Sequence, residues 1–388
     1  MLSLKGIIFV GLLAAMPPQE QDYQEAANAL YNLDFSIAER GFETLTRESP
    51  DNPDYWNALA STIYLRVIHD QEKMNMESFT QQDKFGTRAS REGVDLKDEK
   101  RLRDLLTTAM EKSKAILKNK PNDVRALYAL GNSNATLAAF EATVKRSKFS
   151  ALGPAKESRR LHEQVLKLDP SFHDARIAVG TYDYVVSVIP ALLRWILRIG
   201  GSDKATGIRE LEMGVAKGKL ARTDGRMLLA VVYSREKRYN DALQVLNDLH
   251  GKYPRNFVFE LSKGSVYEKM RQWDKAIQVY DQVLSKNTAK TDGYERLREE
   301  KIHYFIGNAN VHRRQFDRAV ESFHKVIAGA NATPDEKAGS HLWIGKMLDS
   351  KKDRARAVQH YDAVLASKCD PELQAEARKY KRRAYGGV

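Results

Sequence analysis

The sequence predicts an all-α fold, a solenoid of about eight helix–turn–helix units over residues 20–388. Segments of similar pattern recur through the chain, and in its C-terminal half they follow one another at steps of 34, 43 and 38 residues. Within each segment, small and large apolar residues recur four positions apart, as they do on one face of an α-helix. The 388 residues include 11 Pro and no Gly/Ser-rich linker, which favours one continuous body.

The N-terminal sequence MLSLKGIIFVGLLAAM predicts a signal peptide over residues 1–16. Lys5 precedes an apolar run, and Ala14 and Ala15 supply the small residues of a cleavage site. The run is about half the length needed to span a bilayer as a helix. We expect cleavage near Ala15 and a periplasmic or secreted protein. The alternative is an uncleaved signal that tethers the protein to the inner membrane.

The first two units are expected directly after this leader. Ala38 and Phe42 fit the second helix of unit one, and Trp56 fits the first helix of unit two. The second helix of unit two is expected only at LLTTAMEKSKAILKNKPND. Residues 67–97 are charged and lack an apolar period, which predicts an inserted loop or hairpin.

Units three and four carry insertions of about 15 residues each. Unit three begins at ALYALGNSNA with Gly131, and unit four begins at ARIAVGTYDY with Gly180. The insertion in unit four, IPALLRWILRIGG at residues 189–201, predicts a short amphipathic helix with Pro190 in its first turn. Its length and its two arginines argue against a transmembrane span.

Units five to eight repeat three positions: a small residue, an Ala twelve positions later, and a large apolar residue four positions after that. These sets are Ala230, Gly264, Gly307 and Gly345, then Ala242, Ala276, Ala319 and Ala357, and finally Leu246, Tyr280, Phe323 and Tyr361. We expect the small residues to let the two helices approach and the large residue to fill the gap. Asp241, Asp274 and Asp317 are expected to be helix N-caps. Residues 371–388 are expected to form a capping helix and tail.

This pattern resembles the tetratricopeptide repeat, a helix–turn–helix unit of about 34 residues. The resemblance implies a right-handed superhelix that binds a peptide or partner helix in the concave groove lined by the first helix of each unit. The residues that it places in this groove are Asn57, Tyr128, Asn132, Thr181, Met227, Leu261, Tyr304, Asn308 and Lys346. Packing between units is the alternative role for Tyr128 and Tyr304.

Two destinations remain open for the inserted helix at 189–201. It folds into the groove of its own array, or it docks on a partner or on the membrane interface with its tryptophan at headgroup level. Its docking residues are Leu192, Leu193, Arg194, Trp195, Ile196, Arg198 and Ile199.

The sequence lacks the patterns of an active site. It has no H-E-x-x-H, no paired Cys and no G-x-S-x-G, so we expect no metal, no cofactor and no enzymatic activity. Cys369 is the single cysteine and cannot form an internal disulfide. The net charge of +12 includes basic clusters at 144–160 and 378–385. We interpret them as a solvated loop and a basic cap, with no nucleic-acid partner.

These observations favour a protein–protein interaction scaffold at the bacterial cell envelope, with a protein or peptide partner. The alternative is a membrane-peripheral structural factor that docks through residues 189–201. An enzyme or small-molecule binder would instead need a polar pocket with convergent titratable groups, and the sequence does not indicate one.

Overall fold

The computed structural model of the protein describes residues 18–71, 95–191, 194, 200 and 203–386. The expected signal peptide, residues 72–94 of the first insertion and the docking residues 192–193 and 195–199 of the second lie outside this part of the chain. All regular secondary structure within the described residues is helical, as predicted.

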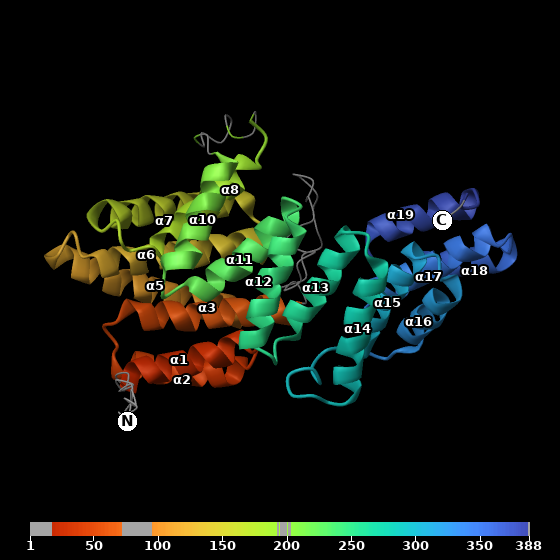
Figure 1. Ribbon diagram of the computed structural model, residues 1–388, viewed down its shortest axis with the longest axis horizontal. Helices are drawn as coiled ribbons and strands as arrows, with labels where there is room; N and C mark the ends of the chain where they lie inside the picture. Colours follow the sequence, from red (N-terminus) through yellow and green to blue (C-terminus); the bar gives the residue numbers. More distant parts are fainter. Residues whose placement is uncertain (1–17, 72–94, 192–193, 195–199, 201–202, 387–388) are drawn as a thin grey trace, which may run out of the picture.

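The described helices pack in consecutive pairs, and each pair is one unit of the solenoid (Figure 1). The first helices of the units are α1 (Pro18–Tyr31), α3 (Pro53–Asp70), α6 (Val124–Thr143), α8 (Ala175–Ser187), α11 (Arg222–Arg235), α13 (Phe257–Lys269), α15 (Glu299–His312) and α17 (Pro334–Ser350). The second helices are α2 (Phe35–Glu48), α5 (Leu96–Asn119), α7 (Lys148–Leu168), α10 (Lys204–Lys217), α12 (Tyr239–Lys252), α14 (Trp273–Thr288), α16 (Phe316–Ala328) and α18 (Arg354–Ala366). The cap, α19 (Pro371–Arg382), follows unit eight.

The predicted contact between small and large residues holds the helix pairs of units six to eight together. A Cβ atom added at Gly307 of α15 would lie 2.6 Å from Cε1 of Phe323 on α16, and one added at Gly345 would lie 2.6 Å from Cε1 of Tyr361. Both aromatic side chains are fully buried. The helices can therefore approach this closely only because the facing residue lacks a side chain.

The extra residues of units two and three lengthen their helices. The helices α5, α6 and α7 have 24, 20 and 21 residues, against 14 each in α11 and α12. The loop expected over residues 67–97 is therefore wrong at both ends. Val67 and Ile68 are buried within α3, and Asp95 caps α5 by accepting a hydrogen bond from the amide of Lys97.

The predicted N-caps are also wrong. Asp241, Asp274 and Asp317 lie in the first turns of α12, α14 and α16, whose N-cap residues make no side-chain capping hydrogen bond. The carboxylate of Asp274 instead lies 2.5 Å from Arg313, and that of Asp317 lies 3.1 Å from Lys351. These last two aspartates therefore link one unit to the next.

The turn of unit one docks on loops that lie more than 200 residues further along the chain. Asp34 is 5% exposed and accepts hydrogen bonds from Arg255 and, at 3.1 Å, from Arg296. The side-chain amide of Asn256 donates to the carbonyl oxygen of Tyr31 at 2.8 Å. The loops before α13 and α15 therefore hold unit one by polar contacts.

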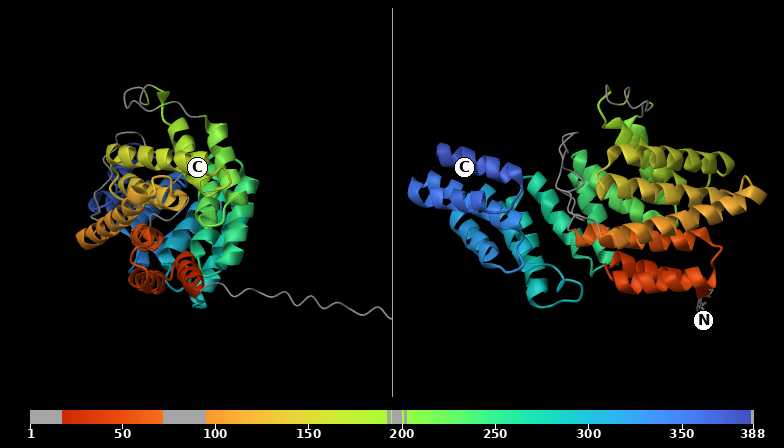
Figure 2. Two further views of the ribbon diagram at one scale, coloured as in Figure 1. Left: turned by 90° about the vertical axis from the view of Figure 1, so that its left-hand side faces the viewer. Right: turned by 180° about the vertical axis from the view of Figure 1, so that it is seen from behind.

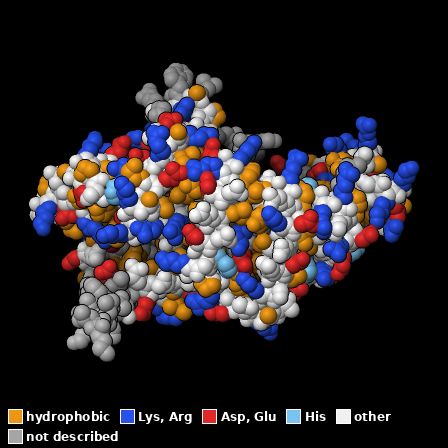
Figure 3. All heavy atoms as spheres, viewed as in Figure 1, with side chains coloured by type: hydrophobic (Ala, Val, Ile, Leu, Met, Phe, Trp, Pro, Cys, Tyr) orange, Lys and Arg blue, Asp and Glu red, His pale blue; other side chains and the backbone are white. Residues whose placement is uncertain are grey.

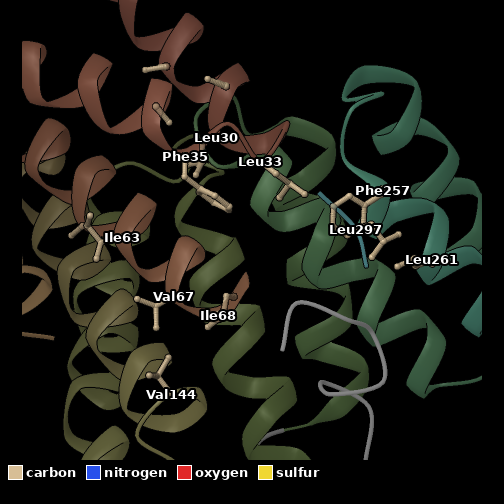
Figure 4. Close-up of a cluster of buried hydrophobic side chains, with 14 of the residues drawn as sticks. Leu30, Leu33, Phe35, Ile63, Val67, Ile68, Val144, Phe257, Leu261 and Leu297 are labelled. Carbon is tan, nitrogen blue, oxygen red and sulfur yellow. The ribbon is translucent and has the colours of Figure 1, made fainter. Parts of the chain in front are cut away.

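Apolar side chains complete this contact. Leu33 and Phe35 belong to the same buried cluster as Phe257 and Leu297 (Figure 4). The ring of His69 lies 5.2 Å from that of Phe35 and 6.1 Å from that of Phe257. The array thus curves back until its first unit touches its sixth, and the helices surround a common axis in the end-on view of Figure 2.

Candidate functional site

Three of the predicted groove residues are buried between neighbouring units. The amide nitrogen of Asn57 donates to the carbonyl oxygen of Ala129 at 2.8 Å, and its oxygen accepts from Ser133 at 2.7 Å. Tyr128 and Leu261 are 4% and 7% exposed and lie in apolar clusters. Their placement in a binding groove is therefore wrong, because packing between units covers them.

Lys346 is also buried, under the cap. Its Nζ lies 2.5 Å from a carboxylate oxygen of Glu376 on α19, and 4.3 Å from the ring centroid of Trp343. The rings of Tyr380 and Tyr385 lie 5.3 and 5.6 Å away. Its placement in the groove is wrong as well, since the capping helix folds over it.

The remaining groove residues are half-buried, and their role in binding stays a prediction. They are Asn132, Thr181, Met227, Tyr304 and Asn308. Asn132 contacts His162 at 3.2 Å, and the Thr181 hydroxyl donates to the carbonyl oxygen of Ile177 at 2.6 Å. Tyr304 and Asn308 lie four residues apart on α15 and so share one face of it.

His162 of α7 takes the place of the large apolar residue in unit three. A Cβ atom at Gly131 would lie 2.5 Å from its Cε1, and its Nδ1 lies 2.8 Å from the carbonyl oxygen of Ser158. The side chain is fully buried, and burial lowers its pKa to about 4. The imidazole is therefore neutral at pH 7 and serves packing rather than proton transfer.

Asp224 of α11 lies where unit one meets unit five. It accepts a hydrogen bond from the Tyr31 hydroxyl at 2.9 Å. Burial raises its pKa to about 6, against which the Tyr31 hydrogen bond acts in part. The hydrogen bond from Tyr31 joins α1 to α11, so Asp224 contributes to the contact between these two units.

An open hollow of about 440 Å³ lies at the turn of unit six. Its walls are Glu268 and Lys269 at the end of α13, Arg271 in the turn, Trp273 at the start of α14, and His312 at the end of α15. The indole and imidazole rings stack with centroids 4.6 Å apart and an interplanar angle of 16°. Aromatic and charged groups thus meet where two units join.

The aromatic contacts continue into unit eight. The rings of His312 and Trp343 meet edge to face with centroids 6.0 Å apart, and Trp343 in turn contacts Lys346. We call Trp273, His312 and Trp343 the aromatic row. Neither Trp273 nor His312 is among the residues predicted from the sequence to bind a partner. Trp273 follows Gly264 by nine positions and His312 follows Gly307 by five, so no shared spacing in the sequence indicates the two residues.

The aromatic row can hold an apolar side chain of a ligand, while the charged walls of the hollow contact its polar groups. Across the described ranges, no three His, Cys, Asp or Glu side chains converge as a metal site would require. None of the described helices combines the length and the apolar character needed to cross a bilayer.

Comparison with known proteins finds one family. Residues 261–294 match the model of the tetratricopeptide repeat. No curated protein matches the chain.

Solved structures similar to this chain include tetratricopeptide-repeat proteins. A thermophilic TPR protein of Thermus thermophilus is 16% identical, with a TM-score of 0.35 over 64% of this chain and 98% of that one. Human IFIT1, solved as a dimer with m7Gppp-AAAA, is 15% identical, with a TM-score of 0.45 over 94% of this chain and 87% of that one. Yeast Tom70 is 10% identical, with a TM-score of 0.41 over 94% of this chain and 88% of that one.

The matched segment is unit six, from within α13 to Tyr294. The same pair of helices, closed by the same contact between a small and a large residue, recurs in units seven and eight. Residues 261–294 therefore form a tetratricopeptide repeat, and units seven and eight share its helix pair and its contact between a small and a large residue.

Proposed function

We propose that this protein is an interaction scaffold that binds a segment of a partner protein on the inner face of units six to eight. The observation that carries this proposal is the hollow lined by Trp273 and His312. Tyr304, Asn308 and His312 follow one another at intervals of four residues, so they form one stripe of α15 that leads into the hollow.

The chemistry of this surface suits a protein partner. Tryptophan and arginine are the residues that most often dominate the binding energy of protein interfaces, and Trp273, Trp343 and Arg271 lie at or beside the hollow. The groove-facing residues of units two and three are engaged in packing, and the cap covers Lys346 of unit eight. Among the predicted groove residues that stay half-buried, Tyr304 and Asn308 of unit seven lie on the same helix as His312, which lines the hollow.

We also propose that the protein acts in the cell envelope of a bacterium. The support is the order of residues 1–16, in which a basic residue, an apolar run and small residues follow one another.

Site-specific photo-crosslinking in intact bacterial cells tests both proposals. We expect p-benzoylphenylalanine at Asn308 to give a discrete protein adduct in the periplasmic fraction. The matched control carries the same group at Gln278, an exposed position of α14. His312→Ala is expected to reduce the Asn308 adduct severalfold, because it removes one exposed wall of the hollow.

The outcomes separate binding from location. Equal adducts at Asn308 and Gln278, or none at Asn308, would overturn binding on the inner face. A specific adduct confined to the cytoplasm would overturn the location and leave the binding surface in place.

A further inference from the structure

In units one and five to eight, the turn between the two helices has one residue in the left-handed conformation. In units five to eight this residue is Lys237, Arg271, Arg314 and Lys352, with φ of 61°, 56°, 63° and 63°. The amide of the following residue donates to the carbonyl oxygen five positions earlier, at 2.8 to 2.9 Å in all four turns. The four side chains are exposed and occupy the same position in four consecutive units.

Conformation alone does not account for these residues. The left-handed conformation costs a residue with a Cβ roughly 1–2 kcal/mol, and Gly or Asn is the common choice at such helix ends. Attraction between a cation and the negative end of the helix dipole returns about 0.3–1 kcal/mol. A Lys or Arg therefore carries a positive charge in all four turns, although the left-handed backbone conformation there favours Gly or Asn.

In unit one, the side chain at this position of the turn contacts another part of the protein. Its left-handed residue is Leu33, with φ of 67° and the same backbone hydrogen bond from Asp34 to Ala29. Leu33 is 3% exposed because it is buried in the contact between unit one and unit six. The turn that docks through an apolar side chain in unit one presents a cation in units five to eight.

The surrounding turns are basic as well. Residues 268–275, 311–318 and 349–356 contain ten Lys and Arg against five Asp and Glu. The end of α19 adjoins this edge, since Arg354 donates to the carbonyl oxygen of Lys381 at 2.6 Å. Arg382 and Arg383 are exposed there. Figure 3 shows Lys and Arg side chains along the upper margin of the half that holds α13 to α19.

We propose that this basic edge, formed by Lys237, Arg271, Arg314, Lys352, Arg382 and Arg383, binds an extended acidic segment of the partner protein. The inference rests on the proposed scaffold function and names the chemistry of its partner. Successive units place the cations on the order of 10 Å apart, so an extended chain rising about 3.3 Å per residue meets one cation every three residues.

Two observations favour a peptide over other polyanions. The edge follows a superhelix, so a flat bilayer would touch only part of it, whereas a flexible chain can follow its curve. His312 already covers one face of the Trp273 ring, which leaves the hollow suited to a side chain rather than to a stacked base.

Fluorescence anisotropy with a labelled twenty-residue peptide of repeating Glu-Ser-Glu-Leu tests the proposal. The test variant combines Lys237→Asn, Arg271→Asn, Arg314→Asn and Lys352→Asn. Asn tolerates the left-handed conformation, so the variant is expected to melt no lower than the parent. We expect the parent to bind with an affinity that falls as salt rises, and the variant to bind at least tenfold more weakly.

The matched control removes four exposed cations from other helices, as Lys114→Gln, Lys118→Gln, Arg209→Gln and Lys217→Gln. It is expected to keep at least half of the parent affinity. Equal weakening in both variants, or none in the Asn variant, would overturn the proposal. Tighter binding of a twenty-nucleotide poly-uridine, or of phosphatidylglycerol vesicles, than of the peptide would also overturn it.

The photo-crosslink at Asn308 separates this inference from the scaffold function. If the Asn variant still forms that adduct at the parental level, the acidic-segment proposal fails while the scaffold function stands. If the peptide binds the basic edge and no adduct forms at Asn308, the inner face is not the binding surface.

Discussion

His162 occupies in unit three the position that Tyr280, Phe323 and Tyr361 occupy in units six to eight. All four side chains lie against a glycine of the first helix. The histidine differs in that its ring can take up a proton, and a charged imidazole is unstable in a site without solvent. A residue that fills space at neutral pH therefore becomes a source of acid sensitivity.

We predict that His162 makes the protein less stable in mild acid. The unfolded imidazole binds a proton below about pH 6.5, while burial lowers the folded pKa to about 4. The unfolded state therefore takes up protons first as pH falls, and the free energy of unfolding decreases between these values, by on the order of 2 kcal/mol at pH 5. Urea denaturation at pH 7.5 and pH 5 measures it.

His162→Phe supplies the comparison, since Phe323 fills the same position in unit seven. The variant is expected to lose less stability between the two pH values than the parent, by that same amount. Identical pH dependence in both proteins would show that the buried imidazole is not responsible. The repeat pattern of units five to eight places a large side chain opposite the small residue, but it carries no information about the pKa of a histidine in that position.

At the scale of the helix pair, the contact between a glycine and an aromatic ring sets how closely two helices pack. Gly307→Ala is expected to lower the free energy of unfolding by about 1–3 kcal/mol, because the new methyl group overlaps the fully buried Phe323 ring. The matched control is Gly251→Ala in α12, where the added Cβ has no atom within 4 Å beyond its chain neighbours and the backbone of its own helix. It is expected to raise stability by up to about 1 kcal/mol.

Chemical denaturation of both variants measures the two changes in the free energy of unfolding. Because alanine favours a helix over glycine at either position, opposite signs isolate the packing contribution. A rise in stability in both variants would mean that α15 and α16 do not pack as tightly as the structure indicates.

Helix pairs were predictable where the repeat is regular, and less so elsewhere. The spacing from Gly307 to Ala319 and Phe323 predicts which faces of the two helices contact each other, because each of these positions has a steric role. The caps were not predictable in this way. The N-cap residues of α14 and α16 make no side-chain capping hydrogen bond, and Asp274 and Asp317 pair with the following unit instead.

At the scale of the whole molecule, unit one contacts the loops before α13 and α15. In a simple solenoid, units so far apart in the sequence do not touch. Asp34 is central to it, as a buried carboxylate between Arg255 and Arg296. Those arginines are 36% and 45% exposed, which limits the energy of each pair. Leu33 and Phe35 supply the apolar part of the contact.

Asp34→Asn is expected to lower the free energy of unfolding by about 2–3 kcal/mol, because two arginines lose a buried partner. Amide hydrogen exchange should become faster in α1 and α2 and stay unchanged in α16 to α18. The radius of gyration from small-angle X-ray scattering should increase. Asp51→Asn, which breaks an exposed pair between the loop before α3 and Lys112 of α5, is expected to cost less than about 1 kcal/mol.

Unchanged hydrogen exchange in the Asp34 variant would contradict the closure. The closure itself was not predictable from the repeat, since every unit pattern describes only its neighbours. Leu33 and Asp34 sit in an ordinary turn sequence, and Arg255 and Arg296 lie in loops without a period. The same limit applies to the predicted groove residues. The repeat pattern predicted the positions of Asn57 and Tyr128 on their helices, but the packing that buries them depends on the curvature of the superhelix.

The closure also fixes the number of repeats. A solenoid whose units touch only their neighbours can gain or lose a unit by duplication or deletion at modest cost. In this chain, an added unit between α3 and α12 would carry the arginine loops away from Asp34 and leave Leu33 and Phe35 without a partner surface. Whole units can therefore be added or lost only beyond unit seven. Within the closed part of the array, the number of units is fixed by the contact with unit one.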